Sequence, residues 1–314
     1  MTNSTSVLRV AAIGVGHLGR HHARILSTLP GADLVGVVDI KPDRAAEIAA
    51  ACHSKPFTDF HALLGQVDAV SIAVPTNAHL EVALPFLEQG IPVLVEKPLA
   101  RSVGEADRLI AAAASKGVVL AVGHTERHNP AVGAAAQYLQ DPRFIEVHRL
   151  GTFSERSLDI DVVFDLMIHD LDVVLSLVHG EVASIEAVGV PVLTGRVDIA
   201  NARIRFENGC IANITASRIS RDRVRKIRFF QPDTYLSIDY AAQEVEMYRL
   251  VRGTVKPTIE GGKLDVPREE PLARELADFL GAVREHRRPL VAGEDGRRAL
   301  DLAQRITDRM AAGV

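Results

Sequence analysis

The chain has 314 residues, of which 36 are basic and 40 are acidic, so its net charge is −4. This balance gives no electrostatic footprint for nucleic acid or an anionic membrane, and we expect neither as a partner. No stretch approaches the roughly 20 apolar residues of a membrane span, and the length suffices for two domains with their own cores.

Two cysteines, Cys52 and Cys210, lie far apart and lack metal-ligand spacing. We expect them to be buried thiols in a reducing compartment, and we expect no metal site. The N-terminus shows no basic segment ahead of a long apolar core, so the expected location is the cytoplasm.

A glycine-rich turn follows the first apolar run, residues 8–13, and reads Gly14-Val15-Gly16-His17-Leu18-Gly19. In a dinucleotide-binding turn the first glycine permits the bend, the second lets pyrophosphate approach the backbone, and the third packs helix on strand. The helix that follows would present its N-terminus to the phosphates. A purely structural glycine turn is the alternative.

A second apolar run, residues 34–38, ends at Asp39, about 20 residues past the last glycine, as the dinucleotide fingerprint requires. A carboxylate here accepts both ribose hydroxyls and repels a 2′-phosphate, so NAD is expected in preference to NADP. Lys41 is the one neighbour that argues for NADP, and an acidic helix cap is the alternative role of Asp39.

Helical and strand patterns then alternate up to residue 124, which predicts a doubly wound parallel sheet. The expected elements are helices over 43–51, 59–64, 77–88 and 103–116, and strands over 69–74, 92–95 and 118–122. Pro75, Thr76 and Asn77 follow one strand, where Thr76 or Asn77 either caps the next helix or contacts the nicotinamide ribose.

The run Pro92-Val93-Leu94-Val95 stops at Glu96-Lys97-Pro98. Ligands of open parallel sheets bind at the carboxyl ends of strands, and Lys97 occupies such an end. A lysine beside a cationic nicotinamide can exchange protons near neutral pH, with Glu96 holding it in position. The alternative is an ordinary strand exit with a solvated ion pair.

Residues 125–314 are expected to form a second domain, with Asn129 capping a helix that begins at Pro130. Strand patterns dominate, and Glu207-Asn208-Gly209 predicts a hairpin turn between strands 199–206 and 210–216. Further strands are expected at 225–230, 235–240 and 245–250, and helices at 272–285 and 295–311. An open, largely antiparallel sheet leaves one face for a partner subunit, so we expect a homodimer or homotetramer.

One helix, predicted over residues 161–178, carries a narrow polar stripe on an otherwise apolar cylinder. The stripe spans an arc of roughly 80° and contains Asp161, Asp165, His169 and Asp172. Asp165 and His169, at i and i+4, can hydrogen-bond, which makes His169 a candidate general base; a structural polar network is the alternative. Asp170 lies on the apolar side and is expected to bond to backbone or to an arginine.

The glycine turn, Glu96-Lys97-Pro98 and the Asp165-to-Asp170 pattern resemble the Gfo/Idh/MocA oxidoreductase family over the whole chain. The resemblance implies an N-terminal Rossmann domain, a C-terminal α/β domain with an open sheet, and oxidation of sugars or inositols with NAD or NADP. It implies proton transfer by Lys97 and His169 with support from Asp165, and a cis Lys97–Pro98 bond. The expected cofactor contacts are Gly14, Gly16, His17, Leu18, Gly19, Asp39, Pro75, Thr76, Asn77, His79, Glu96 and Lys97.

Residues 154–161 depart from the glycine-rich stretch that many members of this family carry, and they add Arg156. Arg156 and Arg127, with a cluster at Arg218, Arg221, Arg223 and Arg225, offer places for a phosphate or carboxylate. The expected substrate contacts are Arg127, Arg156, Asp165 and His169.

The segment 124–130 is similar to the subgroup of the family that oxidises the 3-hydroxyl of UDP-N-acetylglucosamine or its uronic acid. The expected substrate is therefore a nucleotide sugar. Three alternatives stay open: an inositol or free-sugar dehydrogenase that uses the same residues, a regulator that binds NAD without catalysis, and a scaffold within a pathway complex.

Overall fold

The protein is described by a computed structural model over residues 7–153, 160–253 and 256–312, and contacts between Cα atoms divide it into two units. The first unit comprises Met1–Thr125 and Glu270–Arg297, and the second comprises Glu126–Glu269 and Arg298–Val314. Residues 270–297, which the sequence analysis assigned to the second domain, therefore belong to the first unit.

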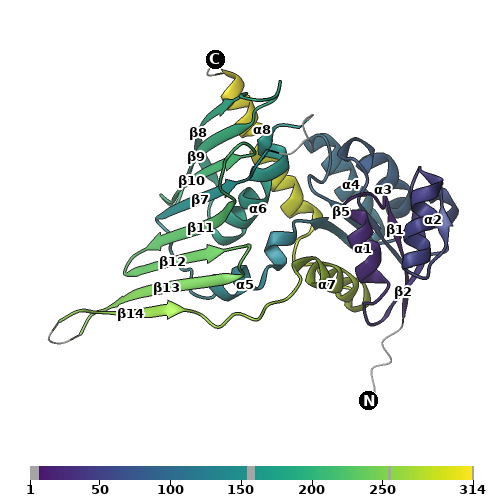
Figure 1. The fold of residues 1–314 in the computed structure, drawn as a ribbon, viewed down its shortest axis with the longest axis horizontal. Helices are drawn as coiled ribbons and strands as arrows, with labels where there is room; N and C mark the ends of the chain where they lie inside the picture. The colour runs from purple at the N-terminus through teal and green to yellow at the C-terminus, as the bar shows by residue number, and fades with distance from the viewer. Residues whose placement is uncertain (1–6, 154–159, 254–255, 313–314) are drawn as a thin grey trace. The chain divides into compact units, whose positions relative to one another are not determined.

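The first unit is built on a six-stranded parallel sheet with strand order β3-β2-β1-β4-β5-β6 (Figure 1). Its strands are β1 (Leu8–Ile13), β2 (Ala32–Val38), β3 (Pro56–Phe57), β4 (Ala69–Ile72), β5 (Val93–Glu96) and β6 (Leu120–Gly123). The strand order reverses between β1 and β4, so the loops that follow these two strands flank the place where ligands of such sheets bind.

Helices connect the strands, as the alternating pattern predicted. They are α1 (Gly19–Leu26), α2 (Pro42–Ala51), α3 (His79–Glu88) and α4 (Val103–Lys116). A further helix of this unit, α7 (Pro271–Glu285), comes from the later segment and connects no strands of the sheet. The helix expected at 59–64 is only a short 3-10 helix, Phe60–Leu63.

Helix α7 belongs to the first unit because its apolar face is buried against that unit's core. Leu276, Phe279 and Leu280 pack in one cluster with residues of β1 and α1, among them Val10 and Leu26. Amphipathicity predicted the helix but could not say which sheet it covers.

Gly14 and Gly19 show why the turn between β1 and α1 needs glycine. Gly14 has φ +81°, and a Cβ built on Gly19 would lie 1.8 Å from the carbonyl oxygen of Gly14. Any side chain at position 19 would therefore separate the helix from the turn.

The second unit is built on an eight-stranded sheet with strand order β14-β13-β12-β11-β7-β10-β9-β8. Only the β7–β10 pair is parallel, so the expected largely antiparallel sheet is confirmed. The strands are β7 (Phe144–Leu150), β8 (Val182–Val190), β9 (Ile199–Phe206), β10 (Ile211–Ser217), β11 (Val224–Gln231), β12 (Thr234–Asp239), β13 (Glu244–Val251) and β14 (Thr258–Lys263).

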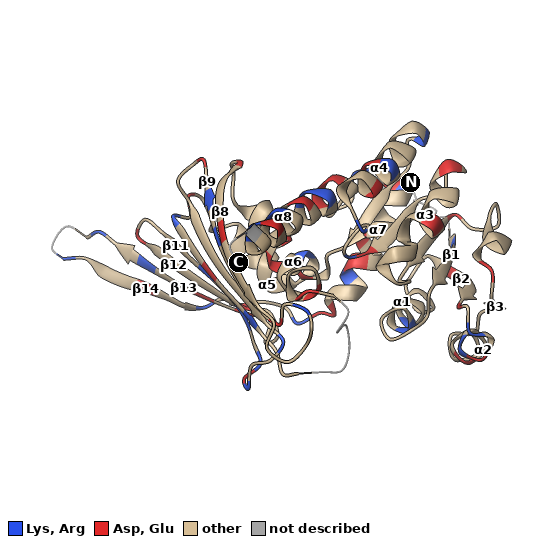
Figure 2. Ribbon diagram, turned by 90° about the horizontal axis from the view of Figure 1, so that it is seen from above, with Lys and Arg blue, Asp and Glu red and all other residues tan. Residues whose placement is uncertain are grey.

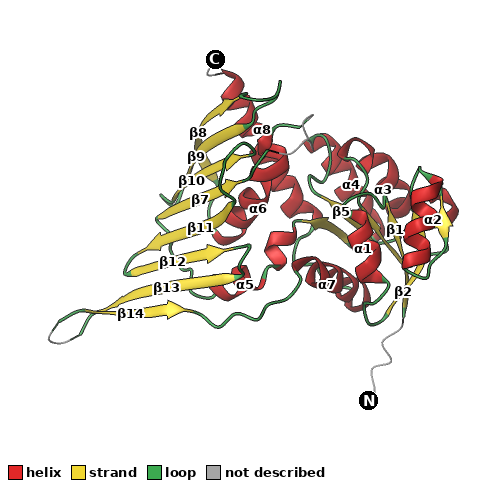
Figure 3. Cartoon of the chain, in the orientation of Figure 1, coloured by secondary structure: helices red, strands yellow, loops and turns green. Residues whose placement is uncertain are grey.

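One face of this sheet carries the core of the unit, and helices cover it (Figure 3). The covering segments are α5 (Pro130–Ala136), a π-helix (Val163–Met167), α6 (Ile168–Leu177) and the second-unit part of α8 (Gly293–Ala312). Asn129 caps α5 as predicted, since its side chain accepts the N–H of Ala131 at 3.1 Å. Charged residues of both signs are spread over both units (Figure 2).

Candidate functional site

Five loops of the first unit follow the carboxyl ends of parallel strands and therefore share one edge of the sheet. They begin at Gly14, Asp39, Ala73, Lys97 and His124. The structure thus brings the glycine turn, the acidic strand end and the lysine to the same edge, as the sequence predicted for a dinucleotide site.

Asp39 is buried at the end of β2. Its Oδ1 accepts the backbone N–H of Lys41 at 2.9 Å, and Oδ2 lies 3.6 Å from Nη1 of Arg44. Helix α2 takes no side-chain cap from Asp39, because its N-cap position is Lys41. The sequence analysis did not identify Arg44. The one feature that could have indicated a role near Asp39 is its position in the first turn of α2, the helix that follows Asp39.

The glycine turn fits a pyrophosphate because its backbone is open. A Cβ built on Gly16 would meet its nearest neighbour, Nη1 of Arg44, only at 3.6 Å. His17 and Leu18 are exposed on this turn. The residues present therefore fit a dinucleotide: Gly14, Gly16 and Gly19 would shape the phosphate turn, and Asp39 would meet the ribose.

Glu96 ends β5 as a buried carboxylate. Its Oε2 accepts the backbone N–H of Lys97 at 3.2 Å, and its Oε1 lies 3.1 Å from Nε2 of His22. The other ring nitrogen of His22 lies 2.7 Å from the hydroxyl of Ser71. Glu96 therefore holds the backbone of Lys97, as expected. His22 was missed, although a histidine three residues after Gly19 on the buried face of α1 was a visible signal.

Pro75, Thr76 and Asn77 lie in the loop after β4, where a 3-10 helix, Thr76–Ala78, leads into α3. Neither the 3-10 helix nor α3 has a side-chain cap, so the capping interpretation of Thr76 and Asn77 is wrong. The extra 3-10 turn makes Ala78, rather than Thr76 or Asn77, the N-cap of α3.

His79, the first residue of α3, is buried. Its Nδ1 lies 3.0 Å from the carbonyl oxygen of Pro98, and its Nε2 lies 3.0 Å from that of Val74. Burial lowers the pKa of His79, although both carbonyl groups and the charge of Glu96 oppose the shift. The Lys97–Pro98 bond is cis, as the resemblance implied.

In the second unit, the prediction of an uninterrupted α-helix over residues 161–178 is wrong. A π-helix occupies Val163–Met167, and α6 begins only at Ile168. A π-helix has more residues per turn than an α-helix, so the α-helical geometry from which the stripe of roughly 80° was predicted does not hold at Asp165. A π-helix is rare, and it often marks a functional site.

The two outer members of the stripe make contacts within the second unit. Oδ1 of Asp161 accepts the N–H of Val197 at 3.0 Å, and Oδ1 of Asp172 lies 3.4 Å from Nη1 of Arg127. Asp165 and His169 are half-buried. The stripe therefore divides into two structural carboxylates and the two candidate catalytic residues.

Asp170 bonds to an arginine, which confirms the expectation from its place on the apolar side. The buried Arg149 donates through Nε and Nη2 to the two oxygens of Asp170, and through Nη1 and Nη2 to Oε1 of Glu126 at 3.1 Å. Burial alone would lower the pKa of Arg149, but the two carboxylates raise it. Its guanidinium is thus a fixed positive charge that holds Asp170, the residue after His169 in the sequence.

A cavity of about 480 Å³ opens beside this network in the second unit. It is lined by Arg149, Leu150, Gly151, Thr152, Phe153, Asp165, Leu166, Arg218, Arg223 and Arg225. Four arginines and one aspartate line the cavity. Arg149 already pairs with Glu126 and Asp170, and Arg218 lies 3.8 Å from Asp198. Arg223 and Arg225 are exposed, so their charges are available to an anion. Three of the four arginines come from the cluster noted in the sequence; Arg156 lies outside the described residues, and Arg149 was missed.

Two of these arginines are held in place. Arg218 donates to the carbonyl oxygens of Ile160 and Val197, and Nη2 of Arg223 lies 3.2 Å from the hydroxyl of Thr152. Arg225 is exposed and lies opposite Arg149 in the β11–β7 register. Preorganised guanidinium groups of this kind recognise phosphate or carboxylate oxygens.

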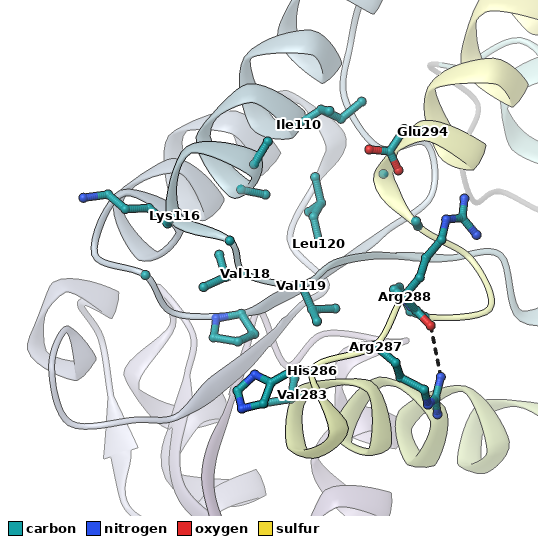
Figure 4. Close-up of a pocket in the computed structure, with 18 of the residues that line it drawn as sticks. Ile110, Lys116, Val118, Val119, Leu120, Val283, His286, Arg287, Arg288 and Glu294 are labelled. Carbon is teal, nitrogen blue, oxygen red and sulfur yellow. Dashed lines mark hydrogen bonds between the residues drawn. The ribbon is translucent and has the colours of Figure 1, made fainter.

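A cavity of about 730 Å³ in the first unit lies at the opposite edge of its sheet, near the amino ends of β5 and β6 (Figure 4). Its described lining, which includes Lys116, Val118, Leu120, His286 and Arg288, contains none of the expected cofactor contacts. Volume alone therefore does not locate the dinucleotide site.

Among the described residues, no group of three or more His, Cys, Asp or Glu side chains is arranged to hold a metal ion. The same part of the chain contains no helix with the length and apolar character that a membrane crossing requires.

Comparison with known proteins identifies the family. The family described as "Oxidoreductase family, NAD-binding Rossmann fold" matches residues 8–124, and the GFO/IDH/MocA C-terminal domain matches residues 133–231. The UDP-N-acetylglucosamine 3-dehydrogenase of Acidithiobacillus ferrooxidans is 41% identical over 306 residues, which cover 95% of this chain and 96% of that protein. Its solved structure superposes with a TM-score of 0.91 over 97% of this chain and 98% of that one.

More distant proteins share parts of this pattern. The scyllo-inositol 2-dehydrogenase (NAD(+)) of Bacillus subtilis is 30% identical over 68% of each chain. A levoglucosan dehydrogenase in complex with NADH and L-sorbose, 20% identical, shares the fold with a TM-score of 0.88 over 97% of each chain. The chain belongs to the Gfo/Idh/MocA oxidoreductase family.

Proposed function

We propose that this chain is an NAD-dependent dehydrogenase that oxidises the 3-hydroxyl of a UDP-N-acetylhexosamine. The observation that carries the substrate class is the cavity lined by Asp165 together with Arg149, Arg218, Arg223 and Arg225. An inositol or a free sugar has no anionic group for such a cavity, whereas a nucleotide sugar carries a diphosphate. The relative that acts on UDP-N-acetylglucosamine also matches nearly the whole chain.

The reaction converts a secondary alcohol and NAD⁺ into a ketone, NADH and a proton. NAD supplies the hydride acceptor when it is bound. We assign to Lys97 and His169 the transfer of the hydroxyl proton, and to Asp165 the support of His169 and contact with the substrate. Gly14, Gly16 and Gly19 shape the pyrophosphate turn, and Thr76 and Asn77 contact the nicotinamide ribose.

A panel of substrates tests this assignment. UDP-N-acetylglucosamine and its uronic acid should reduce NAD, whereas myo-inositol and glucose should give at least about 100-fold lower kcat/KM, since charge-assisted bonds to the diphosphate are lost. Equal or higher kcat/KM with the free polyols would favour the inositol or sugar dehydrogenase. NAD binding without reduction by any alcohol would favour the regulator.

Arg225→Ala should raise KM for the UDP-sugar by about 10- to 100-fold, as expected for the loss of one charge-assisted bond. Arg228→Ala is the matched control, because Arg228 lies on the same strand and pairs instead with Glu146 at 2.6 Å. Steady-state kinetics measure both variants. An unchanged KM for Arg225→Ala would show that this cavity does not bind the UDP-sugar.

We assign NAD as the preferred cofactor because Asp39 occupies the ribose position. The nearby Arg44 is available to a 2′-phosphate once this carboxylate is removed, since its guanidinium lies 3.6 Å from Asp39. Asp39→Ser should therefore shift the NADP-to-NAD ratio of kcat/KM toward NADP by at least about tenfold. Asp43→Ser is the control, because Asp43 is an exposed carboxylate in α2, the helix that carries Arg44. An unchanged ratio in Asp39→Ser would contradict the assignment.

We further propose that a second copy of the chain covers the outer face of the eight-stranded sheet. Phe144, Phe230, Tyr235 and Tyr248 form a row across four strands, with ring centroids 5.3–6.3 Å apart. Phe230 is 37% exposed and Tyr248 is 43% exposed. Light scattering should give a dimer or tetramer, and a monomer at assay concentration would contradict this proposal.

The cytoplasm is the location we assign to the enzyme. Cys52 and Cys210 are both free and buried, and burial raises the pKa of Cys210 to about 11. Free thiols of this kind suit a reducing compartment. Recovery of the protein in an exported fraction after cell fractionation would contradict the assignment.

A further inference from the structure

His79 joins two loops of the first unit that the proposed chemistry needs. One loop, which follows β4, contains Val74, Thr76 and Asn77; the other carries Lys97 and Pro98 after β5. The ring of His79 lies between their backbones, 3.0 Å from the carbonyl oxygen of Val74 and 3.0 Å from that of Pro98. With Glu96 bonded to the N–H of Lys97, the lysine segment is held on both sides.

We propose that His79 is a positioning residue, which sets the place of Lys97 through the carbonyl group of Pro98 and couples it to the loop after β4. This rests on the proposed role of Lys97 in proton transfer. The ring is buried and both of its nitrogens lie against backbone carbonyl groups. It therefore acts on the reaction through the backbone of Lys97 and Pro98 rather than through contact with the cofactor.

The two ring nitrogens can be tested separately. The amide of asparagine replaces Nδ1 of histidine, and the longer amide of glutamine replaces Nε2. A neutral imidazole carries a hydrogen on only one of its nitrogens, and the proposed role places it on Nδ1, which then donates to the carbonyl oxygen of Pro98. His79→Asn keeps this donor, His79→Gln moves the amide toward Val74, and His79→Leu leaves the carbonyl oxygen of Pro98 without it.

Kinetics provide the first readout. His79→Asn should keep kcat within about fivefold of the wild type, whereas His79→Leu and His79→Gln should lower kcat by about 100-fold, as expected when a reacting group is misplaced by about 1 Å. The Kd of NAD should change by less than about fivefold in all three. His61→Leu, an exposed histidine of the same unit, is the control. Equal kcat for the Asn and Gln variants would overturn the proposal.

Hydrogen exchange provides the second readout, and it depends on neither the substrate nor the role of Lys97. His79→Leu should speed amide exchange in residues 74–78 and 99–101 and leave β1 and α4 unchanged. Faster exchange throughout the unit, or no change in the two loops, would show that His79 does not couple them. If His79→Leu fails to fold, the Asn and Gln variants still decide the question.

The two proposals can fail separately. If Lys97→Ala retains turnover, the assigned chemistry fails, whereas local exchange in His79→Leu would still establish the coupling of the two loops. If Lys97→Ala is inactive but the histidine variants show neither the kinetic order nor the local exchange, only the positioning role fails.

Discussion

Lys97→Ala should lower kcat by about 100- to 10,000-fold, the range that general acid–base catalysis contributes. Lys97 stands directly after β5, at the edge of the sheet where the glycine turn and Asp39 also lie. Its backbone N–H is bonded to the buried Glu96, so the side chain starts from a fixed point. The Kd of NAD should stay within about threefold, because Gly14, Gly16 and Asp39 are untouched.

Two lysine variants separate charge from proton transfer. Lys97→Arg keeps the positive charge but not the ability to give up a proton, so it should be as inactive as the alanine variant. Lys116→Ala, at the far end of α4 beside the other cavity of the unit, should retain full turnover. Normal kcat in Lys97→Ala would refute the assignment of the lysine.

His169→Asn should lower kcat by about 100-fold or more, since an amide can bond to the substrate hydroxyl but cannot take its proton. His169 lies one residue after the start of α6, directly behind the π-helix and next to Asp170, which the buried Arg149 anchors. This anchoring fixes the helix that carries the imidazole.

The pH dependence of kcat/KM distinguishes a base from a structural residue. Loss of the imidazole should remove one ionisation from the profile of His169→Asn, whereas a structural role would lower the rate at every pH without changing the shape. His148→Asn, a half-buried histidine on β7, is the control and should keep the wild-type profile. An unchanged profile in His169→Asn would exclude His169 as the base.

The first unit could be predicted in most of its parts because each motif has a local cause. At Gly14 and Gly19 the neighbouring backbone leaves no room for a side chain. Asp39 and Lys97 each follow a buried apolar strand. Local pattern does not show partners from distant segments. His22 of α1 meets Ser71 of β4 and Glu96 of β5 only in the folded unit, and the apolar face of α7 packs against residues of β1 and α1 that are distant in the sequence.

The second unit was harder to predict for two physical reasons. The hydrogen bonds of a π-helix span one residue more than those of an α-helix, and apolar periodicity over residues 161–178 did not separate the two. Strands β8 and β14 were not predicted, because apolar and polar residues do not alternate along their sequences as they do in a typical half-buried strand. The arginine cluster was visible in sequence, but only the fold places Arg149 and Asp165 in the same cavity.

The central claim is that hydride passes from the sugar carbon to NAD while residues of this chain take the hydroxyl proton. The most direct measurement uses UDP-N-acetylglucosamine carrying deuterium at carbon 3. We expect deuterium in the NADH produced by the wild type, and its transfer should be about 100- to 10,000-fold slower with Lys97→Ala. NADH formed without deuterium, or deuterium transfer undiminished in Lys97→Ala, would contradict this claim.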